Sequence, residues 1–392
     1  MHFLVLTLLL LGSSLYATNL TELINSSLAN NPSLDAITAR IKASEANIYI
    51  AKQFANPELS LTTNTLDNSQ AMSKTLLSIK QNIPYFNKRS TREQVALADK
   101  SLKEEQLNTA KVALVAKIKK EAYTIWQLQE LTKIINNYIT LTKHNIDIYE
   151  SYATTNENQH LGIIKAELSL ADFTIEKSTL DAKMDAAYAR LSYLSALKVT
   201  HLEITLTITH KPELQQLQDS LQNNPTIALK EKELKKQNAA VALSALDKYP
   251  DLNLISGYAH RENFEDYFNI GIAFSLPIYG RENAKEEEAR AMQLSYASQK
   301  MDATNSVNAL FKAYYAQMQS AYNIYHIVQD DALPQIIHMF DLSNASISTS
   351  GDLFKYIDVL FQKFSLEQKS INAVASYHQA KAKISELAGA LK

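Results

Sequence analysis

The chain contains no cysteine among its 392 residues, which excludes disulfides, thiolate metal sites, a cysteine nucleophile and a lipid-modified amino-terminal cysteine. Glycine and proline are scarce as well, with 7 and 8 residues, so long stretches of Ala, Leu, Lys, Gln, Glu and Ser run without a helix breaker. This usage is typical of long helices rather than of loop-rich enzymes. The composition therefore predicts a mainly helical protein.

An excess of either charge is also missing, because 39 Lys and Arg stand against 41 Asp and Glu. A formal charge of −2 gives no global attraction to nucleic acid, and we expect no nucleic-acid partner. After residue 17 no apolar run approaches the 18 residues or so that a transmembrane helix needs. If the chain enters a membrane, it does so as β-structure.

The first 17 residues have the pattern of a signal peptide. An apolar core over residues 3–11 is followed by Gly12 and by a small residue, Ala17, at the expected cleavage point. No basic residue precedes the core, and Leu15 occupies the −3 position. The alternative is a buried amino-terminal helix, since the run is too short to span a bilayer. We expect an exported chain, cleaved after residue 17.

The sequence repeats itself with an offset of 193 residues. Four anchors keep this register across about 60 residues, which predicts one duplicated unit with a first repeat over 18–200 and a second over 219–392. The matching pairs are residues 27–32 with 220–225, Pro57 with Pro250, Pro84 with Pro277, and residues 86–88 with 279–281.

Each repeat has the same predicted order of helix, β-hairpin, very long helix, turn and long helix. Pro32 and Pro225 lie in a first helical turn, where the missing N–H costs nothing. The long helices are expected over 90–197 and 282–391. Residues 91–152 contain neither Pro nor Gly, and a helix of that length would reach on the order of 90 Å.

The two hairpins, predicted over 57–84 and 250–277, alternate apolar with small or polar residues, so each has one apolar face. Strands of about 10 residues fit a tilted membrane crossing, although exposed hairpins on a soluble helical protein are the alternative. The connecting tips, 65–72 and 259–267, are mostly polar. Four strands cannot close a membrane barrel, which needs at least about 8, and lipid does not tolerate open edges. We therefore expect the chain to associate with further copies. The alternating apolar positions are Leu59, Leu61, Leu77, Ile79, Ile83, Leu252, Leu254, Tyr258, Phe268, Ile270, Ile272, Phe274 and Leu276.

Residues 201–218 connect the repeats. Alternation from Leu202 to Ile208 predicts a short strand, and a helix is expected from Pro212. We expect both in a small collar outside the long helices.

The sequence contains no recognisable catalytic constellation. It has no Gly-rich phosphate loop, no His-Glu-x-x-His and no Ser in a nucleophile turn. The nine His and seven Met are scattered singly, so neither a metal site nor a cofactor is predicted. We expect a protein that is not an enzyme.

Together these features resemble the TolC-type outer-membrane efflux factors. The resemblance rests on the duplication, on Asn-Asn-Pro in each repeat, on the strand-end motifs at residues 83–89 and 276–281, and on Gly351 followed by residues 358–360. It implies a homotrimer in the outer membrane of a Gram-negative bacterium, whose 12-stranded β-barrel continues as a periplasmic α-barrel. It also implies a periplasmic adaptor and an inner-membrane pump as partners. The Lys-Arg pair after the aromatic at Phe86 resembles the heavy-metal efflux subgroup.

The implied function is a passive exit duct for drugs or heavy-metal ions. The alternatives are a periplasmic helical scaffold or adaptor, and the outer-membrane component of type I protein secretion. Where the family has two acids at a periplasmic aperture, this chain has Asp358 and Phe361. Three Asp358 side chains would attract cations, and Phe361 would form an apolar constriction; an exposed helix acid is the alternative for Asp358. The strand ends are expected at Pro57, Pro84, Pro250 and Pro277, and the adaptor contacts at Asn156, Asn158, Gly351 and Asp352.

Overall fold

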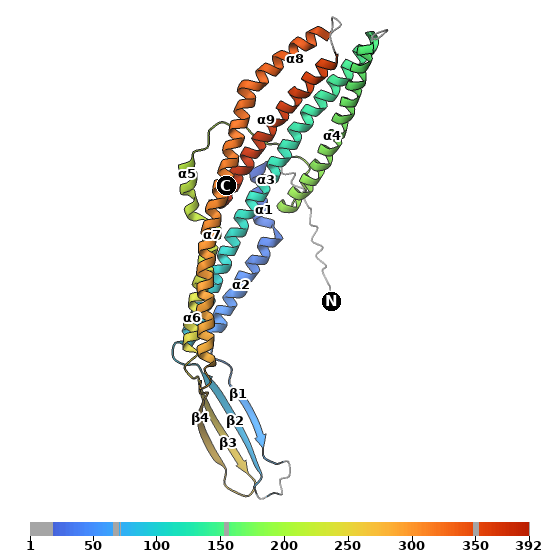
Figure 1. Ribbon diagram of the computed structural model, residues 1–392. Coiled ribbons are helices and arrows are strands. Elements are labelled where there is room, and N and C mark those ends of the chain that lie inside the picture. Colours follow the sequence, from blue (N-terminus) through green and yellow to red (C-terminus); the bar gives the residue numbers. More distant parts are fainter. Residues whose placement is uncertain (1–18, 66–69, 71, 153–156, 348–352, 392) are drawn as a thin grey trace, which may run out of the picture. The chain divides into compact units, whose positions relative to one another are not determined.

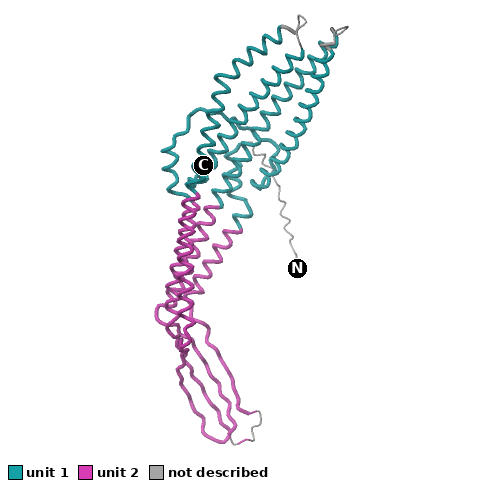
Figure 2. Tube along the Cα trace, viewed as in Figure 1, with its two compact units in different colours: residues 1–35, 110–224, 307–392 teal, residues 36–109, 225–306 magenta. Residues whose placement is uncertain are grey.

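The computed structural model describes residues 19–65, 70, 72–152, 157–347 and 353–391. The predicted signal peptide lies outside these residues. The chain divides into two compact units (Figure 2), the first formed by residues 1–35, 110–224 and 307–392 and the second by residues 36–109 and 225–306. Each unit takes segments from both sequence repeats. The two compact units therefore do not coincide with the two sequence repeats.

The helices occupy most of the described chain (Figure 1). Pro32 and Pro225 each open a helix, as the sequence predicts. In the first unit lie α1 (Leu20–Asn30), α4 (Glu157–Ser195), α5 (Leu214–Asp219), the 3₁₀ turn η1 (Ser220–Asn223), the π-helical turn η2 (Ile327–Ala332), α8 (Leu333–Ile347) and α9 (Leu353–Leu387). The second unit holds α6 (Pro225–Leu246). Three helices have residues in both units: α2 (Pro32–Lys52), α3 (Lys88–Tyr152) and α7 (Arg281–His326).

The long helix expected from residue 282 is interrupted after His326 by η2. Within this turn the Leu333 N–H bonds to the carbonyl of Val328, five residues earlier, instead of four. The next residue, Pro334, has no N–H and its ring crowds the preceding helical turn. A wider π turn is one way a helix continues past such a residue.

The second unit contains a four-stranded antiparallel sheet with the strand order β1-β2-β3-β4 (Figure 1). The strands are β1 (Glu58–Thr63), β2 (Lys74–Ile83), β3 (Leu252–Arg261) and β4 (Tyr267–Phe274). Pairing of β2 with β3 joins the two repeats in one sheet, with Leu77 opposite Tyr258. The second connecting tip was expected from Ala259, which is wrong, because β3 continues to Arg261 through pairing with Lys74 of β2.

The register places the alternating apolar residues on one face of the sheet. One row across the four strands consists of Leu59, Ile79, Ser256 and Ile270, and the next of Leu61, Leu77, Tyr258 and Phe268. On the other face Ser60, Ser78, Gly257 and Asn269 form one row. The apolar face is open: Ile270 is 87% exposed and Phe268 77%. Leu276, expected in the last strand, follows the end of β4.

The predicted strand over residues 202–208 is wrong, since this segment pairs with no other strand in the described chain. Its alternation nevertheless sets which side chains are buried: Leu202 and Ile208 are buried, whereas Glu203, Thr205 and Thr207 are exposed. Helix side chains supply bonds that a neighbouring strand would give, as Gln129 Nε2 donates to the Leu202 carbonyl at 3.1 Å. The expected helix begins at Leu214 rather than Pro212.

A core of large side chains holds the helices of the first unit together. Trp126 on α3, Phe311 and Met318 on α7, and Tyr377 on α9 are buried in one cluster, on which Ile204 and Leu206 of the connecting segment also pack. No helix in the described part of the chain is both long and apolar enough to cross a membrane.

Candidate functional site

The seam between α4 and α9 in the first unit contains the predicted aperture residue Asp358. Lys165 Nζ on α4 lies 2.6 Å from Asp358 Oδ1 on α9. The same ammonium lies 3.4 Å from the ring centroid of Phe354. Asp358 keeps 55% of its side chain exposed, so its carboxylate is paired and still open to solvent.

Phe361, the second predicted aperture residue, is part of an aromatic cluster in the same seam. Its ring stacks on that of Phe173 of α4 at 4.9 Å between centroids. Phe173 also meets Phe364 edge-on at 5.1 Å, and Tyr138 of α3 packs against both. Burial, reinforced by the nearby Glu367 carboxylate, raises the pKa of Tyr138. Its hydroxyl donates to Glu367 Oε2 at 3.0 Å. The cluster thus fixes α9 against α3 and α4 one turn beyond Asp358.

Gly162 was not identified from the sequence, yet it sets how closely α4 approaches α9. A Cβ atom added at Gly162 would lie 3.0 Å from Cβ of Leu353. The two helices can therefore be this close only without a side chain at position 162. The one available sequence signal was a lone glycine inside a helical segment, which often marks close packing.

The predicted adaptor-contact residues lie mostly outside the described residues. This holds for Asn156, Gly351 and Asp352. Asn158 lies in the first turn of α4. Their role stays a prediction.

The predicted strand-end prolines lie close to the ends of the strands. Pro57 immediately precedes β1 and Pro84 immediately follows β2. Pro250 lies two residues before β3, and Pro277 three residues after the end of β4.

Lys88, which the sequence marks only as part of the strand-end motif, connects the strand ends of the two repeats. Its buried ammonium lies 2.9 Å from Asp251 Oδ1 and donates to the Tyr249 carbonyl at 3.1 Å. The Tyr85 ring stacks on Tyr249 at 4.5 Å. Burial acts to raise the pKa of Asp251, but hydrogen bonds from Lys88 and from the Tyr85 N–H outweigh it and leave that pKa below its ordinary value. No sequence signal pairs residues this far apart in the chain.

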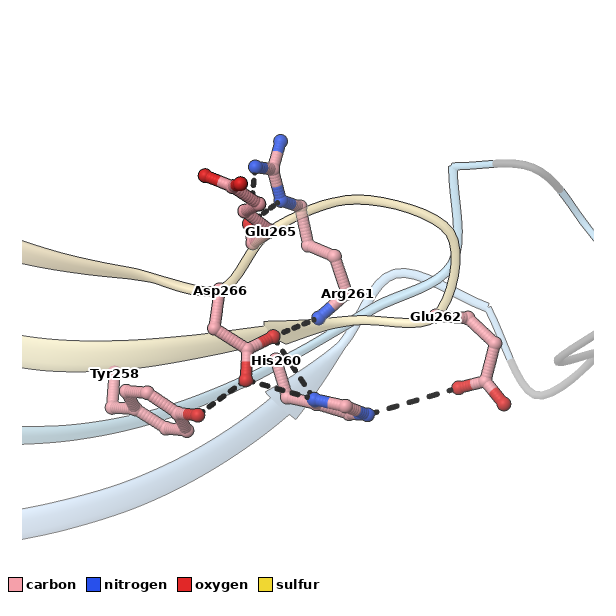
Figure 3. Close-up of polar contacts among 6 residues, drawn as sticks. All are labelled: Tyr258, His260, Arg261, Glu262, Glu265 and Asp266. Atoms are coloured by element: carbon pink, nitrogen blue, oxygen red, sulfur yellow. Dashed lines mark hydrogen bonds and ion pairs between the residues drawn. The ribbon is translucent and has the colours of Figure 1, made fainter.

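A polar network closes the hairpin between β3 and β4. The Asp266 carboxylate accepts hydrogen bonds from the Tyr258 hydroxyl and, at 2.9 Å, from the Arg261 N–H (Figure 3). His260 Nδ1 lies 3.0 Å from Asp266 Oδ1. Since Tyr258 lies on the apolar face, this network marks the tip end of that face. Among the described residues, no group of three or more His, Cys, Asp or Glu is placed to hold a metal ion.

Comparisons with known proteins agree with this architecture. The family model described as "Outer membrane efflux protein" matches residues 23–195. The cobalt-zinc-cadmium resistance protein CzcC of Cupriavidus metallidurans is 23% identical over 353 residues, which cover 87% of this chain and 82% of that protein.

Solved structures share the fold. The CusC structure has a TM-score of 0.78 at 15% identity, covering 94% of this chain and 91% of its own. The open state of the MtrE outer membrane channel of Neisseria gonorrhoeae has a TM-score of 0.80 at 14% identity, covering 95% of this chain and 89% of its own. With the family model over the first repeat, the relative along most of the chain and this common fold, the chain belongs to the outer membrane efflux protein family.

Proposed function

We propose that this protein is the outer-membrane exit duct of a tripartite efflux system and that its cargo is heavy-metal cations. The proposal of a membrane duct is supported by the sheet, which has an exposed apolar face and a polar opposite face. An exposed apolar face that extends across four strands is unfavourable in water and favourable in lipid.

Assembly follows from the two outer strands. β1 and β4 each pair on one side only within the described chain, so each presents a free row of backbone groups. Lipid offers these groups no partner. In a homotrimer β4 of one copy would pair with β1 of the next, giving 12 strands and no open edge. Membrane lipid would then cover the apolar face.

Heavy-metal cargo is supported by the similarity of this chain to CzcC, a cobalt-zinc-cadmium resistance protein. Three Asp358 carboxylates around a threefold axis would form a cation-attracting ring. In this proposal Lys165 holds each Asp358 carboxylate in place. Phe361, one helical turn further along α9, stacks on Phe173 and so fixes the helix that bears Asp358. A periplasmic adaptor would contact the turns at Asn156, Asn158, Gly351 and Asp352, and an inner-membrane pump would supply the energy.

Reconstitution of the purified protein in planar lipid bilayers tests the duct. We expect discrete conductance steps and a protein that fractionates with outer membranes. A fully soluble protein without conductance would instead favour the periplasmic scaffold. Cargo is tested separately, by deleting the gene and comparing cellular resistance to Zn²⁺, Co²⁺ and Cd²⁺ with resistance to organic drugs. Loss of drug resistance alone would reject the metal cargo and leave the duct intact.

A further inference from the structure

A cavity of about 510 Å³ in the first unit combines three basic side chains with no acidic one. It lies between α3, α9 and the segment that connects the repeats. The basic groups are Lys119 on α3 and His378 and Lys381 on α9. The lining residues are Leu20, Lys119, Tyr123, Ile204, Thr205, Leu206, His378, Lys381, Ala382 and Ser385.

Neither lysine of this cavity has an ion-pair partner within the described part of the chain. The acids closest to these lysines in the sequence are engaged elsewhere: Glu121 pairs with Arg190 at 3.0 Å, and Glu386 with Lys383 at 2.8 Å. Of the two cavity lysines, Lys119 is half-buried and Lys381 is exposed. Unlike Lys119, most half-buried lysines in the described part of the chain have an ion-pair partner, as Lys103 does in Asp99 at 2.6 Å. The cavity therefore concentrates positive charge that the protein itself does not neutralise.

The surroundings of Lys119 and His378 disfavour their charged forms. Burial, followed by repulsion from Lys381, lowers the pKa of Lys119. Burial also lowers the pKa of His378, although its bond to the Thr207 carbonyl acts in the opposite direction. An anion in the cavity would relieve both effects, because it favours the charged forms of Lys119 and His378.

The remaining lining can hold an organic anion. Because a carbonyl only accepts, His378 Nε2 donates to the Thr207 oxygen at 3.0 Å and leaves Nδ1 for another contact. The Tyr123 ring lies 5.5 Å from the His378 ring, and burial raises its pKa, so its hydroxyl remains a donor. Leu20, Ile204 and Leu206 add an apolar wall.

We propose that this cavity is a binding site for an oxyanion with two negative charges, either a phosphate group or a dicarboxylate. Lys119 and Lys381 would bind the two charges, and Tyr123 would donate a hydrogen bond. A dianion is expected because two lysines line one cavity. The site does not depend on the proposed duct, and its test uses a different measurement.

Trace acetylation of the purified, full-length assembly tests this site. The rate at Lys119 is followed by mass spectrometry at constant ionic strength in sodium chloride, sodium phosphate or sodium succinate. We expect phosphate or succinate to slow acetylation of Lys119 several-fold relative to chloride. Lys117 and Lys120 flank it on α3 and do not line the cavity, so their rates should not change. Whichever anion protects at the lower concentration identifies the source.

Substitutions define the site. Lys381→Gln is expected to raise the protecting concentration about tenfold, the effect of losing one charge-assisted hydrogen bond. The matched control Lys120→Gln should leave that concentration unchanged. Two results would overturn the proposal: equal acetylation of Lys119 in all three salts, or protection that Lys381→Gln does not weaken. Thermal unfolding of both variants establishes that they remain folded.

Discussion

The side-chain amide of Asn224 donates a hydrogen bond of 2.7 Å to the carbonyl of Leu387. The equivalent residue of the first repeat, Asn31, donates to the Leu194 carbonyl at 3.0 Å. Both bonds span 163 residues, and both asparagines are buried. In each repeat an Asn before the helix-opening Pro thus satisfies a carbonyl at the end of the last long helix. The duplicated Asn-Asn-Pro sequence is therefore explained by a duplicated contact.

Loss of this contact should be measurable. Asn31 Oδ1 also accepts from the Ser33 N–H at 3.0 Å, so Asn31→Asp keeps the cap of α2 but puts a carboxylate oxygen, which cannot donate, against the Leu194 carbonyl. We expect Asn31→Asp and Asn224→Ala each to cost about 1–2 kcal/mol of unfolding free energy, measured as a lower Tm. The exposed neighbours Asn30 and Asn223 serve as controls, replaced by Ala. Equal Tm values for buried and exposed positions would contradict this role.

The duplication also explains the backbone at Asn87 and Gly280. These equivalent residues have φ values of 66° and 71°, in the left-handed region that glycine adopts without cost and that other residues enter at about 1–2 kcal/mol. We expect Gly280→Ala to lower the Tm and Asn87→Gly to leave it equal or higher. Gly271→Ala is the control, because that glycine has no positive φ and an added Cβ would make an ordinary contact. A Tm loss in Gly271→Ala as large as in Gly280→Ala would argue against the backbone explanation.

The features that the sequence predicted well are those that depend on local periodicity. Alternation in residues 268–274 predicted the apolar face of β4, and Pro32 and Pro225 predicted helix starts. Alternation in residues 202–208 predicted the correct buried side chains but the wrong element, since a strand needs a neighbour and this segment has helices beside it.

Contacts between distant residues were beyond such patterns. Lys88 binds Asp251, and Lys165 binds Asp358, from the other repeat in each case. Asp358 matches a family motif, which identifies the residue but not the lysine beside it. Local sequence identifies charged residues, whereas the packing of α4 on α9 decides which of them meet.

The ion pair of Lys165 with Asp358 leads to a conductance prediction. Asp358→Ala should raise the single-channel conductance or weaken the block by multivalent cations, because it removes the carboxylate ring. The Tm should change little, since a half-exposed pair contributes at most about 1 kcal/mol. Asp172→Ala, at an exposed acid of α4 that is not part of this ion pair, is the control and should behave like the unmodified protein.

Exchange of both partners separates the ring from the pair. Lys165→Asp with Asp358→Lys restores an ion pair but reverses the charge at position 358. We expect the exchanged protein to lose sensitivity to multivalent cations, as bilayer recordings would measure. If exchange restored the original sensitivity, the ion pair rather than the carboxylate ring would be the functional feature.

The polar network at the β3–β4 hairpin should respond to acid. Hydrogen bonds from Tyr258, from the Arg261 N–H and from His260 lower the pKa of Asp266 from 3.8 to about 2. A lowered acid pKa stabilises the folded hairpin above pH 3.8, and this contribution is lost as the pH falls toward about 2.

Because the chain lacks cysteine, a spin label at Asn263→Cys reports on this hairpin alone. We expect its mobility to rise between pH 4 and pH 2, and Asp266→Asn to give high mobility at every pH. A second label at the exposed Lys235→Cys of α6 detects general unfolding. A hairpin label that stays immobile at pH 2, or one that becomes mobile only together with the label on α6, would show that Asp266 does not hold the hairpin.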